Sequence, residues 1–250
     1  MIDLNADLGE GFGAWVMGAD EALLDQVTSA SIACGFHAGD PRTMDTAVAR
    51  AAARSVAIGA HVSYPDLVGF GRRQLRVTTE ELTTDVLYQI GALEAFCRRH
   101  GTAVRYVKAH GALYNDMAGD QRLASALGKA VAAYDPGLSV LVLAGSPAVE
   151  VLQQQGLRVV AEGFADRGYS PDGRLIPRGH PGALLTDPAS VAERGWRIAT
   201  GTPIEANDGS PMELQVDSLC VHGDTPGAVN VARELRAVLS ARAVEVAAFT

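Results

Sequence analysis

The feature that most constrains this chain is a repeated alternation of short apolar runs and helical patterns. The runs are rich in Val, Ile and Leu, and each is followed by a Gly or polar cluster and then by a helical pattern. Runs that are apolar throughout are typical of parallel strands covered by helices. We expect strands over 2–7, 29–34, 56–61, 104–110, 139–145, 158–164 and 217–222, with 244–249 as a possible eighth. The alternation predicts an α/β fold, a TIM-like parallel (β/α) barrel of about seven strands.

The helix over 79–100 has the clearest sequence signals. Apolar residues recur at spacings of three and four, Thr78 with Glu81 forms a capping box, and a basic last turn precedes Gly101. Two further helices begin after a cap residue and a proline, over 42–54 and 227–240, the latter after Thr225-Pro226. Weaker patterns indicate helices over 19–28, 120–133, 147–155 and 187–199.

The chain length agrees with one barrel. A (β/α) barrel typically has about 250 residues, and this chain has 250 with no Pro, Ser or charge-rich linker dividing it. We therefore expect a single domain over 1–250. Two Gly-, Pro- and Arg-rich segments, 62–77 and 165–182, are longer than ordinary connections, and long loops in compact domains are usually functional or disordered. The stretch 201–216 carries no clear pattern.

Charge, cysteine content and hydropathy narrow the expected partners and location of the protein. The net charge is −8 without a Lys/Arg cluster, which makes nucleic acid an unexpected partner. Three cysteines with no C-x-x-C pair favour a reducing, cytoplasmic location over a disulfide framework. The first residues lack a signal-peptide pattern, and no stretch of 18 apolar residues predicts a membrane span.

Polar and ionisable side chains gather where the predicted strands end. They are Asn5, Asp7 and Glu10; His37 and Asp40; His61, Ser63 and Asp66; Lys108, His110 and Asn115; Glu162, Asp166 and Arg167; and His222 and Asp224. In a parallel barrel these ends converge on the face where such folds do chemistry. Four of the six histidines lie there, so we expect an active site at this end of the barrel.

Several of these residues have competing structural roles. Asp40 stands just before Pro41, where it can be a helix N-cap residue or a functional residue of the active site. Asn5 can order the first βα turn, and Arg72 can be a solvated loop residue or can bind an anionic ligand. Cys34 and Cys220 lie in apolar runs and are interpreted as small buried hydrophobic residues.

Common catalytic motifs are missing from the sequence. The only Gly-Lys pair, at Gly128-Lys129, is followed by Ala130 rather than Ser or Thr, so there is no P-loop. No G-x-S-x-G elbow is present. The G-x-G at Gly9-Glu10-Gly11 lacks the rest of a dinucleotide fingerprint.

The motifs at the strand ends resemble those of the LamB/YcsF family, the A subunits of prokaryotic ATP-dependent 5-oxoprolinase. They are 3–11 (DLNADLGEG), 31–40 (SIACGFHAGD), 58–61 (IGAH) with 64–66 (YPD) and 69–72 (GFGR), 107–115 (VKAHGALYN), 162–169 (EGFADRGY) and 220–224 (CVHGD). The resemblance runs from residue 3 to about 240. It implies a distorted (β/α) barrel of the glycoside hydrolase/deacetylase type.

The resemblance also implies an activity. The chain would help convert 5-oxo-L-proline (pyroglutamate) and ATP to L-glutamate, ADP and phosphate, with the B and C subunits of 5-oxoprolinase as partners and with Mg²⁺ as a possible companion of ATP. Without a P-loop, ATP binds either at the Gly loops of this barrel or at one of the partners, and the sequence does not choose. A homo-oligomer is also possible.

This chemistry assigns provisional roles to the polar residues. Cations must hold phosphate or carboxylate, a base must activate water, and an acid must protonate the ring nitrogen. The predicted catalytic residues are Asp7, His61, Lys108, His110, His222 and Asp224. The predicted substrate- or phosphate-binding residues are Asn5, Glu10, His37, Asp40, Arg72, Asn115, Asp166 and Arg167. In our hypothesis Asp7 or Asp224 orients a base histidine and Lys108 holds an anionic group.

Two other classes of protein stay open at this point. A metal-dependent amidohydrolase or deacetylase could use Asp7, His37 and His61 to ligate Zn²⁺ at the barrel mouth, although no H-x-x-x-H follows the third strand. A carrier or regulatory small-molecule binder would bind its ligand without turnover.

Overall fold

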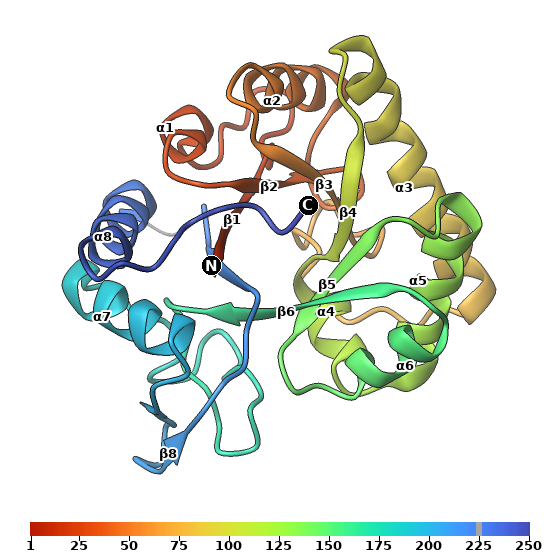
Figure 1. The fold of residues 1–250 in the computed structure, drawn as a ribbon. Coiled ribbons are helices and arrows are strands. Elements are labelled where there is room, and N and C mark those ends of the chain that lie inside the picture. The colour runs from red at the N-terminus through yellow and green to blue at the C-terminus, as the bar shows by residue number, and fades with distance from the viewer. Residues whose placement is uncertain (224–226) are drawn as a thin grey trace.

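Seven parallel strands close into a barrel surrounded by helices (Figure 1). The computed structural model describes residues 1–223 and 227–250. The barrel order is β1-β2-β3-β4-β5-β6-β9. Its strands are β1 (Asp3–Leu8), β2 (Ser29–Ala33), β3 (Ala57–Val62), β4 (Val104–Ala109), β5 (Ser139–Leu143), β6 (Arg158–Phe164) and β9 (Ser218–Val221). The predicted fold class and seven strands are confirmed.

The helices lie around the outside of the barrel. They are α1 (Asp20–Leu24), α2 (Pro41–Ala53), α3 (Thr79–Arg99), α4 (Gly111–Met117), α5 (Gln121–Tyr134), α6 (Ala148–Gln154), α7 (Pro188–Ala199) and α8 (Ala228–Ala241). The α3 capping box is present, since the Glu81 N–H donates to Thr78 Oγ1 and the Thr78 N–H donates to Glu81 Oε2. At α8 the predicted cap and proline, Thr225 and Pro226, lie outside the described residues.

The possible eighth strand over 244–249 is wrong. This segment makes one isolated parallel bridge, between Ile2 and Val246. The reason is that β9 pairs with β1 on one side and β6 on the other, so the seven-stranded barrel already has no free edge. The segment instead crosses the end of the barrel where the chain begins, and Phe249 packs on Tyr106 with ring centroids 5.3 Å apart.

A short helix and a two-stranded hairpin have no counterpart among the predicted elements. The short helix α4 follows β4 directly, with His110 as its N-cap residue. Within the stretch that carried no clear pattern, β7 (Ile204–Glu205) and β8 (Pro211–Met212) form a two-stranded antiparallel hairpin. Both elements are too short to produce a readable hydrophobic period.

Tyr106 is fully buried in the barrel, where it forms a small cluster with Leu141, Val160 and Phe249. A Cβ atom on Gly59 would lie 2.1 Å from the Tyr106 ring, so only glycine lets this tyrosine fill the interior.

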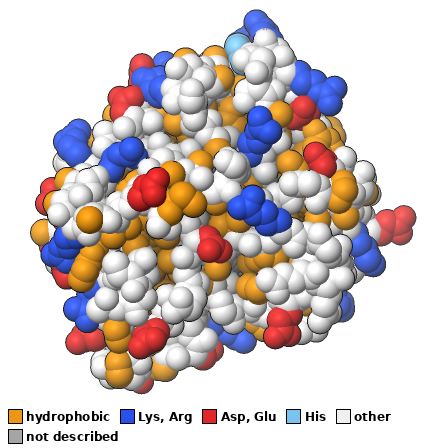
Figure 2. Space-filling view, viewed as in Figure 1, with side chains coloured by type: hydrophobic (Ala, Val, Ile, Leu, Met, Phe, Trp, Pro, Cys, Tyr) orange, Lys and Arg blue, Asp and Glu red, His pale blue; other side chains and the backbone are white. Residues whose placement is uncertain are grey.

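Both termini lie near the centre of the view in Figure 1. On the face shown in Figure 2, Lys and Arg side chains are interspersed with Asp and Glu. Among the described residues no helix is long and apolar enough to cross a membrane.

Candidate functional site

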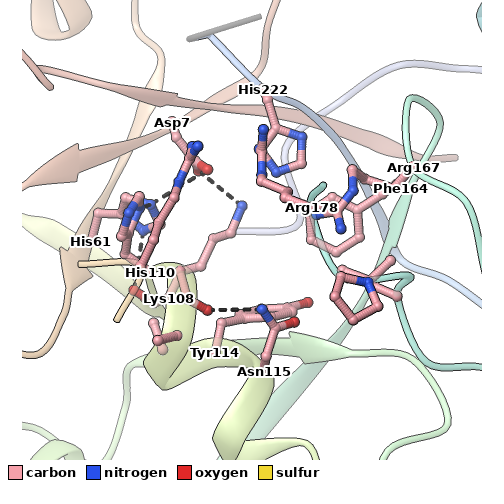
Figure 3. Close-up of a pocket in the computed structure, with 16 residues that line it drawn as sticks. Asp7, His61, Lys108, His110, Tyr114, Asn115, Phe164, Arg167, Arg178 and His222 are labelled. Carbon is pink, nitrogen blue, oxygen red and sulfur yellow. Dashed lines mark hydrogen bonds and ion pairs between the residues drawn. The ribbon is translucent and has the colours of Figure 1, made fainter. Parts of the chain in front are cut away.

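A pocket of about 450 Å³ opens where the carboxyl ends of the strands meet (Figure 3). Its lining combines ionisable side chains with an apolar wall. The lining residues are Asp7, His61, Arg72, Lys108, Ala109, His110, Gly111, Ala112, Tyr114, Asn115, Phe164, Arg167, Leu175, Pro177, Arg178 and His222. The pocket has the size of a small-molecule site and lies on the face where parallel barrels do chemistry.

Lys108 forms the centre of a buried group that we call the lysine cluster: Asn5, Asp7, Lys108, Glu162 and Cys220. Its ammonium nitrogen lies 2.9 Å from Asp7 Oδ1, 2.8 Å from Glu162 Oε1, 3.1 Å from Asn5 Oδ1 and 3.2 Å from Cys220 Sγ. Asn5 also donates to Glu162 Oε1 at 2.9 Å. Because four acceptors surround one cation, the ammonium group is held in a fixed place beneath the pocket.

Asp7 connects this cluster to a second one. Its Oδ1 accepts from Lys108, whereas its Oδ2 lies 3.4 Å from His61 Nε2. Burial opposes ionisation of Asp7, but His61 and Lys108 outweigh burial and hold the pKa of this carboxyl well below its usual value. Burial likewise opposes the charge on Lys108, and Asp7 and the other acceptors raise the pKa of Lys108 well above its usual value. The pair is therefore ionic at neutral pH.

The second group, the imidazole cluster, comprises Glu10, His37, His61 and His110. The His110 ring stacks on His37 with centroids 3.7 Å apart and stands edge-on to His61. Glu10 Oε1 lies 3.2 Å from both His37 Nε2 and His110 Nδ1. Gly71, with φ of 63°, allows this packing, because a Cβ there would lie 2.8 Å from both His37 and His110. Four titratable side chains thus share one buried volume.

Burial controls the protonation of this cluster. Burial, aided by the neighbouring His110, lowers the pKa of His37 to about 3, and burial also lowers the pKa of His110. Burial opposes ionisation of Glu10, but its contacts with His110 and His37 outweigh burial and lower the pKa of this carboxyl. The cluster therefore holds neutral His37 and His110 rings beside an ionised carboxylate at neutral pH.

His222 is oriented by Asp166. The His222 ring donates from Nδ1 to Asp166 Oδ2 at 2.9 Å, and the His222 backbone N–H donates to the same oxygen at 3.3 Å. The ring also stacks on Phe164, with centroids 5.2 Å apart. Because Nδ1 carries the proton, Nε2 keeps its lone pair, and His222 lines the pocket. This carboxylate–imidazole arrangement is the one used by general bases.

Three guanidinium groups, from Arg72, Arg167 and Arg178, line the pocket. Arg167 also donates to the Ala183 and Ile176 carbonyls, at 3.0 and 2.6 Å, so it fixes the long loop after β6 as well as facing the pocket. Burial and the nearby Arg178 lower the pKa of Arg167. A cluster of cations beside an apolar wall suits an anionic ligand with an apolar part.

The structure separates the predicted site residues into four groups. Those that line the pocket are Asp7, His61, Lys108, His110, His222, Arg72, Asn115 and Arg167. Those buried beside these residues, and not among the described lining residues, are Asn5, Glu10, His37 and Asp166. Asp40 caps α2, accepting from the Arg42 and Thr43 N–H groups, and is also outside the lining. Asp224 lies outside the described residues.

The structure bears on two expectations about roles. Asn5 does not order the first βα turn, because its side chain bonds Glu162, Ser218 and Lys108 inside the barrel. Of the two carboxylates expected to orient a base histidine, Asp7 lies 3.4 Å from His61 and Asp224 lies outside the described residues, and the carboxylate that orients His222 is Asp166.

The sequence patterns did not indicate a role for several other residues of the site. Glu162 stands at a strand end but was given no role, and Cys220 is a lysine contact rather than only a buried hydrophobic residue. Tyr114 lines the pocket from α4, a helix that the sequence did not predict. Within the described structure, Tyr114 Oη and Glu162 Oε2 are both buried without a hydrogen-bond partner. Burial and the Glu162 charge raise the pKa of Tyr114 well above its usual value.

A closed parallel barrel with a buried acid–base set at the carboxyl ends of its strands defines the class of barrel enzymes. The chain belongs to the LamB/YcsF family, whose model matches residues 2–250.

Relatives in this family carry names that refer to lactams. The chain is 57% identical over 238 residues to a protein from Pseudomonas syringae pv. tomato that is named as an A subunit of 5-oxoprolinase, covering 95% of this chain and 93% of that protein. A crystal structure titled as a lactam utilization protein from Thermus thermophilus has a TM-score of 0.94 at 46% identity, covering 99% of both chains. A peptidoglycan N-acetylglucosamine deacetylase shares the fold alone, with a TM-score of 0.50 at 11% identity over 99% of this chain and 85% of that one.

Proposed function

We propose that this chain is the A subunit of an ATP-dependent 5-oxoprolinase and that its barrel mouth opens the ring of 5-oxo-L-proline to give L-glutamate. The observation that carries the proposal is the Asp166-oriented His222 on the same pocket as Lys108 and three arginines. The 57% identity to a protein named for this enzyme supports the same activity.

The pocket suits the chemical character of this substrate. 5-Oxo-L-proline is a small ring that carries one carboxylate and one polar amide. A carboxylate can pair with Arg72 or Arg178 at the pocket wall, while the ring methylenes contact Leu175 and Pro177. The amide oxygen then points toward Lys108 and Tyr114 at the floor. Buried cations of this kind stabilise negative charge that develops on an oxygen.

The proposed reaction needs one proton acceptor and one proton donor. Transfer of the γ-phosphoryl group from ATP to the amide oxygen releases ADP and makes the ring carbonyl carbon electrophilic. His222 Nε2 then takes a proton from water as the water oxygen adds to this carbon. The carbon–nitrogen bond then breaks, and the proton passes to the ring nitrogen. A second water releases phosphate from the resulting acyl phosphate, leaving L-glutamate. General acid–base transfer of this type contributes about 10²- to 10⁴-fold in rate.

ATP and the partner subunits belong to the proposal as well. The described chain has no P-loop sequence, so ATP, with Mg²⁺, binds either through the arginines of this pocket or on one of the partners, the B and C subunits. Calorimetry on the isolated chain separates these possibilities. Saturable micromolar binding of ATP supports the first, and its absence at millimolar ATP supports the second.

Omission of this chain tests the proposed activity. Glutamate release and ATP hydrolysis are measured with the B and C subunits, with and without the chain, at equal concentrations of all components. We expect glutamate release only when all three are present. Equal glutamate release without this chain would rule the proposal out.

A metal-dependent amidohydrolase is the second candidate function, and the imidazole cluster favours it. The ligand set expected from the sequence, Asp7, His37 and His61, is not the set that converges in the structure. His61 converges instead with Glu10, His37 and His110. An assay on 5-oxo-L-proline without ATP distinguishes this candidate, because direct hydrolysis would need no nucleotide.

A further inference from the structure

The imidazole cluster contains two histidine nitrogens whose lone pairs face each other. His110 Nε2 lies 2.9 Å from the Phe70 carbonyl oxygen, and His61 Nδ1 lies 3.3 Å from the Lys108 carbonyl oxygen. A carbonyl oxygen can only accept, so each of these nitrogens carries the ring proton. The opposite nitrogens, His110 Nδ1 and His61 Nε2, are therefore left as acceptors, and they lie 2.9 Å apart.

Two carboxylate oxygens lie against the same pair of nitrogens. Glu10 Oε1 is 3.2 Å from His110 Nδ1 and 4.0 Å from His61 Nε2, and Asp7 Oδ2 is 3.4 Å from His61 Nε2. Lys108 meets Asp7 at its other oxygen, Oδ1. Acceptor atoms of Glu10, His61 and His110 thus converge at one place, with Asp7 Oδ2 beside His61. Acceptors in such an arrangement repel one another unless a cation lies between them.

We infer that Glu10, His61 and His110 bind a divalent transition-metal ion, with Asp7 beside it on the pocket side. Ligands at 2.0–2.1 Å from such an ion lie about 2.8 to 3.4 Å apart when the angles at the metal are between right-angled and tetrahedral. The His61–His110 and Glu10–His110 separations of 2.9 and 3.2 Å fit this range, and the Glu10–His61 separation of 4.0 Å would shorten when the ion binds. Imidazole nitrogens select zinc, iron, cobalt or nickel over magnesium or calcium.

The surrounding groups resemble the outer shell of known metal sites. Each ligating ring donates its other nitrogen to a backbone carbonyl, which fixes the tautomer and ring orientation. His37 donates from Nε2 to Glu10 Oε1 and packs flat on His110, so it positions both ligands. Because its ring is nearly parallel to that of His110, at 8°, the two rings cannot both direct an in-plane lone pair at one ion. His37 is therefore a positioning residue.

The site would place its open coordination position toward the pocket. Asp7, His61 and His110 line the pocket, whereas Glu10 and His37 are absent from its described lining. A metal bound by three protein ligands with one open position is typical of catalytic rather than structural sites. The ion would lower the pKa of a bound water beside the substrate. The inference does not depend on the substrate or on ATP.

Metal analysis of the isolated chain tests this inference. The protein is purified without chelators and with any histidine tag removed, and bound metal is measured by mass spectrometry before and after dialysis against Zn²⁺ or Co²⁺. We expect close to one equivalent per chain, and visible d–d absorption for the cobalt form. A chain that stays metal-free after loading would overturn the inference and would indicate a proton shared between the two imidazoles.

Variants locate the ion. His110→Asn and His61→Asn should lose the metal, and Glu10→Gln, which keeps shape and hydrogen bonding, should weaken metal binding at least about tenfold. His37→Asn should weaken it about 10- to 100-fold, the usual effect of an outer-shell group. His100→Ala is the matched control, because His100 pairs with Asp45 on the outer surface. Full metal content in Glu10→Gln and in both ligand variants would contradict the assignment, and circular dichroism confirms that each variant is folded.

Discussion

The lysine cluster and the imidazole cluster lie side by side at the barrel mouth and are bridged by Asp7, but they handle buried charge differently. In the lysine cluster the chain supplies its own cation, and Asn5, Asp7, Glu162 and Cys220 surround the ammonium group of Lys108. In the imidazole cluster His110 Nδ1, His61 Nε2 and Glu10 Oε1 face one another. In our inference these three atoms are acceptors, and the described residues supply no cation between them. The first cluster contains its own cation, whereas the arrangement of the second suits a cation from outside the chain.

The largest effect should come from removing the internal cation. Lys108→Met leaves Asp7 and Glu162 buried without their ammonium partner, and breaking a buried pair costs about 3–5 kcal/mol. The free energy of unfolding from urea titration should fall by this amount, and glutamate release should be lost. Lys129→Met, on the exposed side of α5, is the control and should leave stability unchanged. A decrease in the free energy of unfolding of less than about 1 kcal/mol would show that the Lys108 charge does not stabilise the cluster.

Asp166→Asn should impair His222, the proposed general base, without disturbing the lysine cluster or the imidazole cluster. The amide no longer accepts from both His222 groups, so the ring loses its preferred tautomer while the fold stays intact. Loss of an orienting carboxylate costs up to about 10⁴-fold in rate in enzymes that use this arrangement. We expect a fall in kcat of at least about 10²-fold in the reconstituted enzyme. Asp172→Asn, an exposed carboxylate paired with Arg174, serves as control, and equal rates for the two variants would refute the role of Asp166.

A smaller effect is expected at the pocket wall. Arg178→Ala removes one guanidinium group from the lining, and the loss of a contact made equally to substrate and transition state raises KM without changing kcat. We expect KM for 5-oxo-L-proline to rise about tenfold, as for loss of one charge-assisted hydrogen bond of about 1.5 kcal/mol. Arg174→Ala, outside this lining, provides the comparison. A fall in kcat with constant KM would place Arg178 in the chemical step instead.

The smallest effect should come from Asp40, which lies outside both clusters. Asp40→Ala removes the N-cap of α2 and should lower the free energy of unfolding by about 1 kcal/mol without changing activity. Hydrogen bonds from Gly13 and Thr43 lower the pKa of Asp40 to about 2, below its unfolded value near 3.9. The cap therefore stabilises fully above about pH 4, and its contribution is lost as the pH falls through 2. A stability difference between wild type and variant that persists below pH 2 would contradict this origin.

Local signals in the sequence predicted most of the fold. The seven strands and the capped helix α3 have a hydrophobic period or a cap that depends only on nearby residues. The error at 244–249 has a different cause, because ring closure between β9 and β1 is set by the whole barrel. The short helix α4 is also defined by its place after β4 rather than by a pattern of its own.

Strand-end position predicted where the site lies, but not which side chains meet there. His61 and Lys108 are register partners on neighbouring strands, so their proximity follows from topology. The partners of His222 and His37 could not be predicted, because Asp166 and Glu10 come from loops whose course depends on tertiary packing. Cys220 has an apolar sequence context, although its side chain contacts Lys108 in the barrel interior. The roles of these residues, and the single-domain assignment over 1–250, stay predictions.

The most direct test of the central claim, that this barrel mouth opens 5-oxo-L-proline, uses His222→Asn in the enzyme reconstituted with the B and C subunits. Glutamate release is measured for wild type, for His222→Asn and for the surface control His100→Ala. The account predicts a loss of about 10²- to 10⁴-fold for His222→Asn and wild-type rates for the control. A His222→Asn enzyme that releases glutamate at the wild-type rate would contradict it.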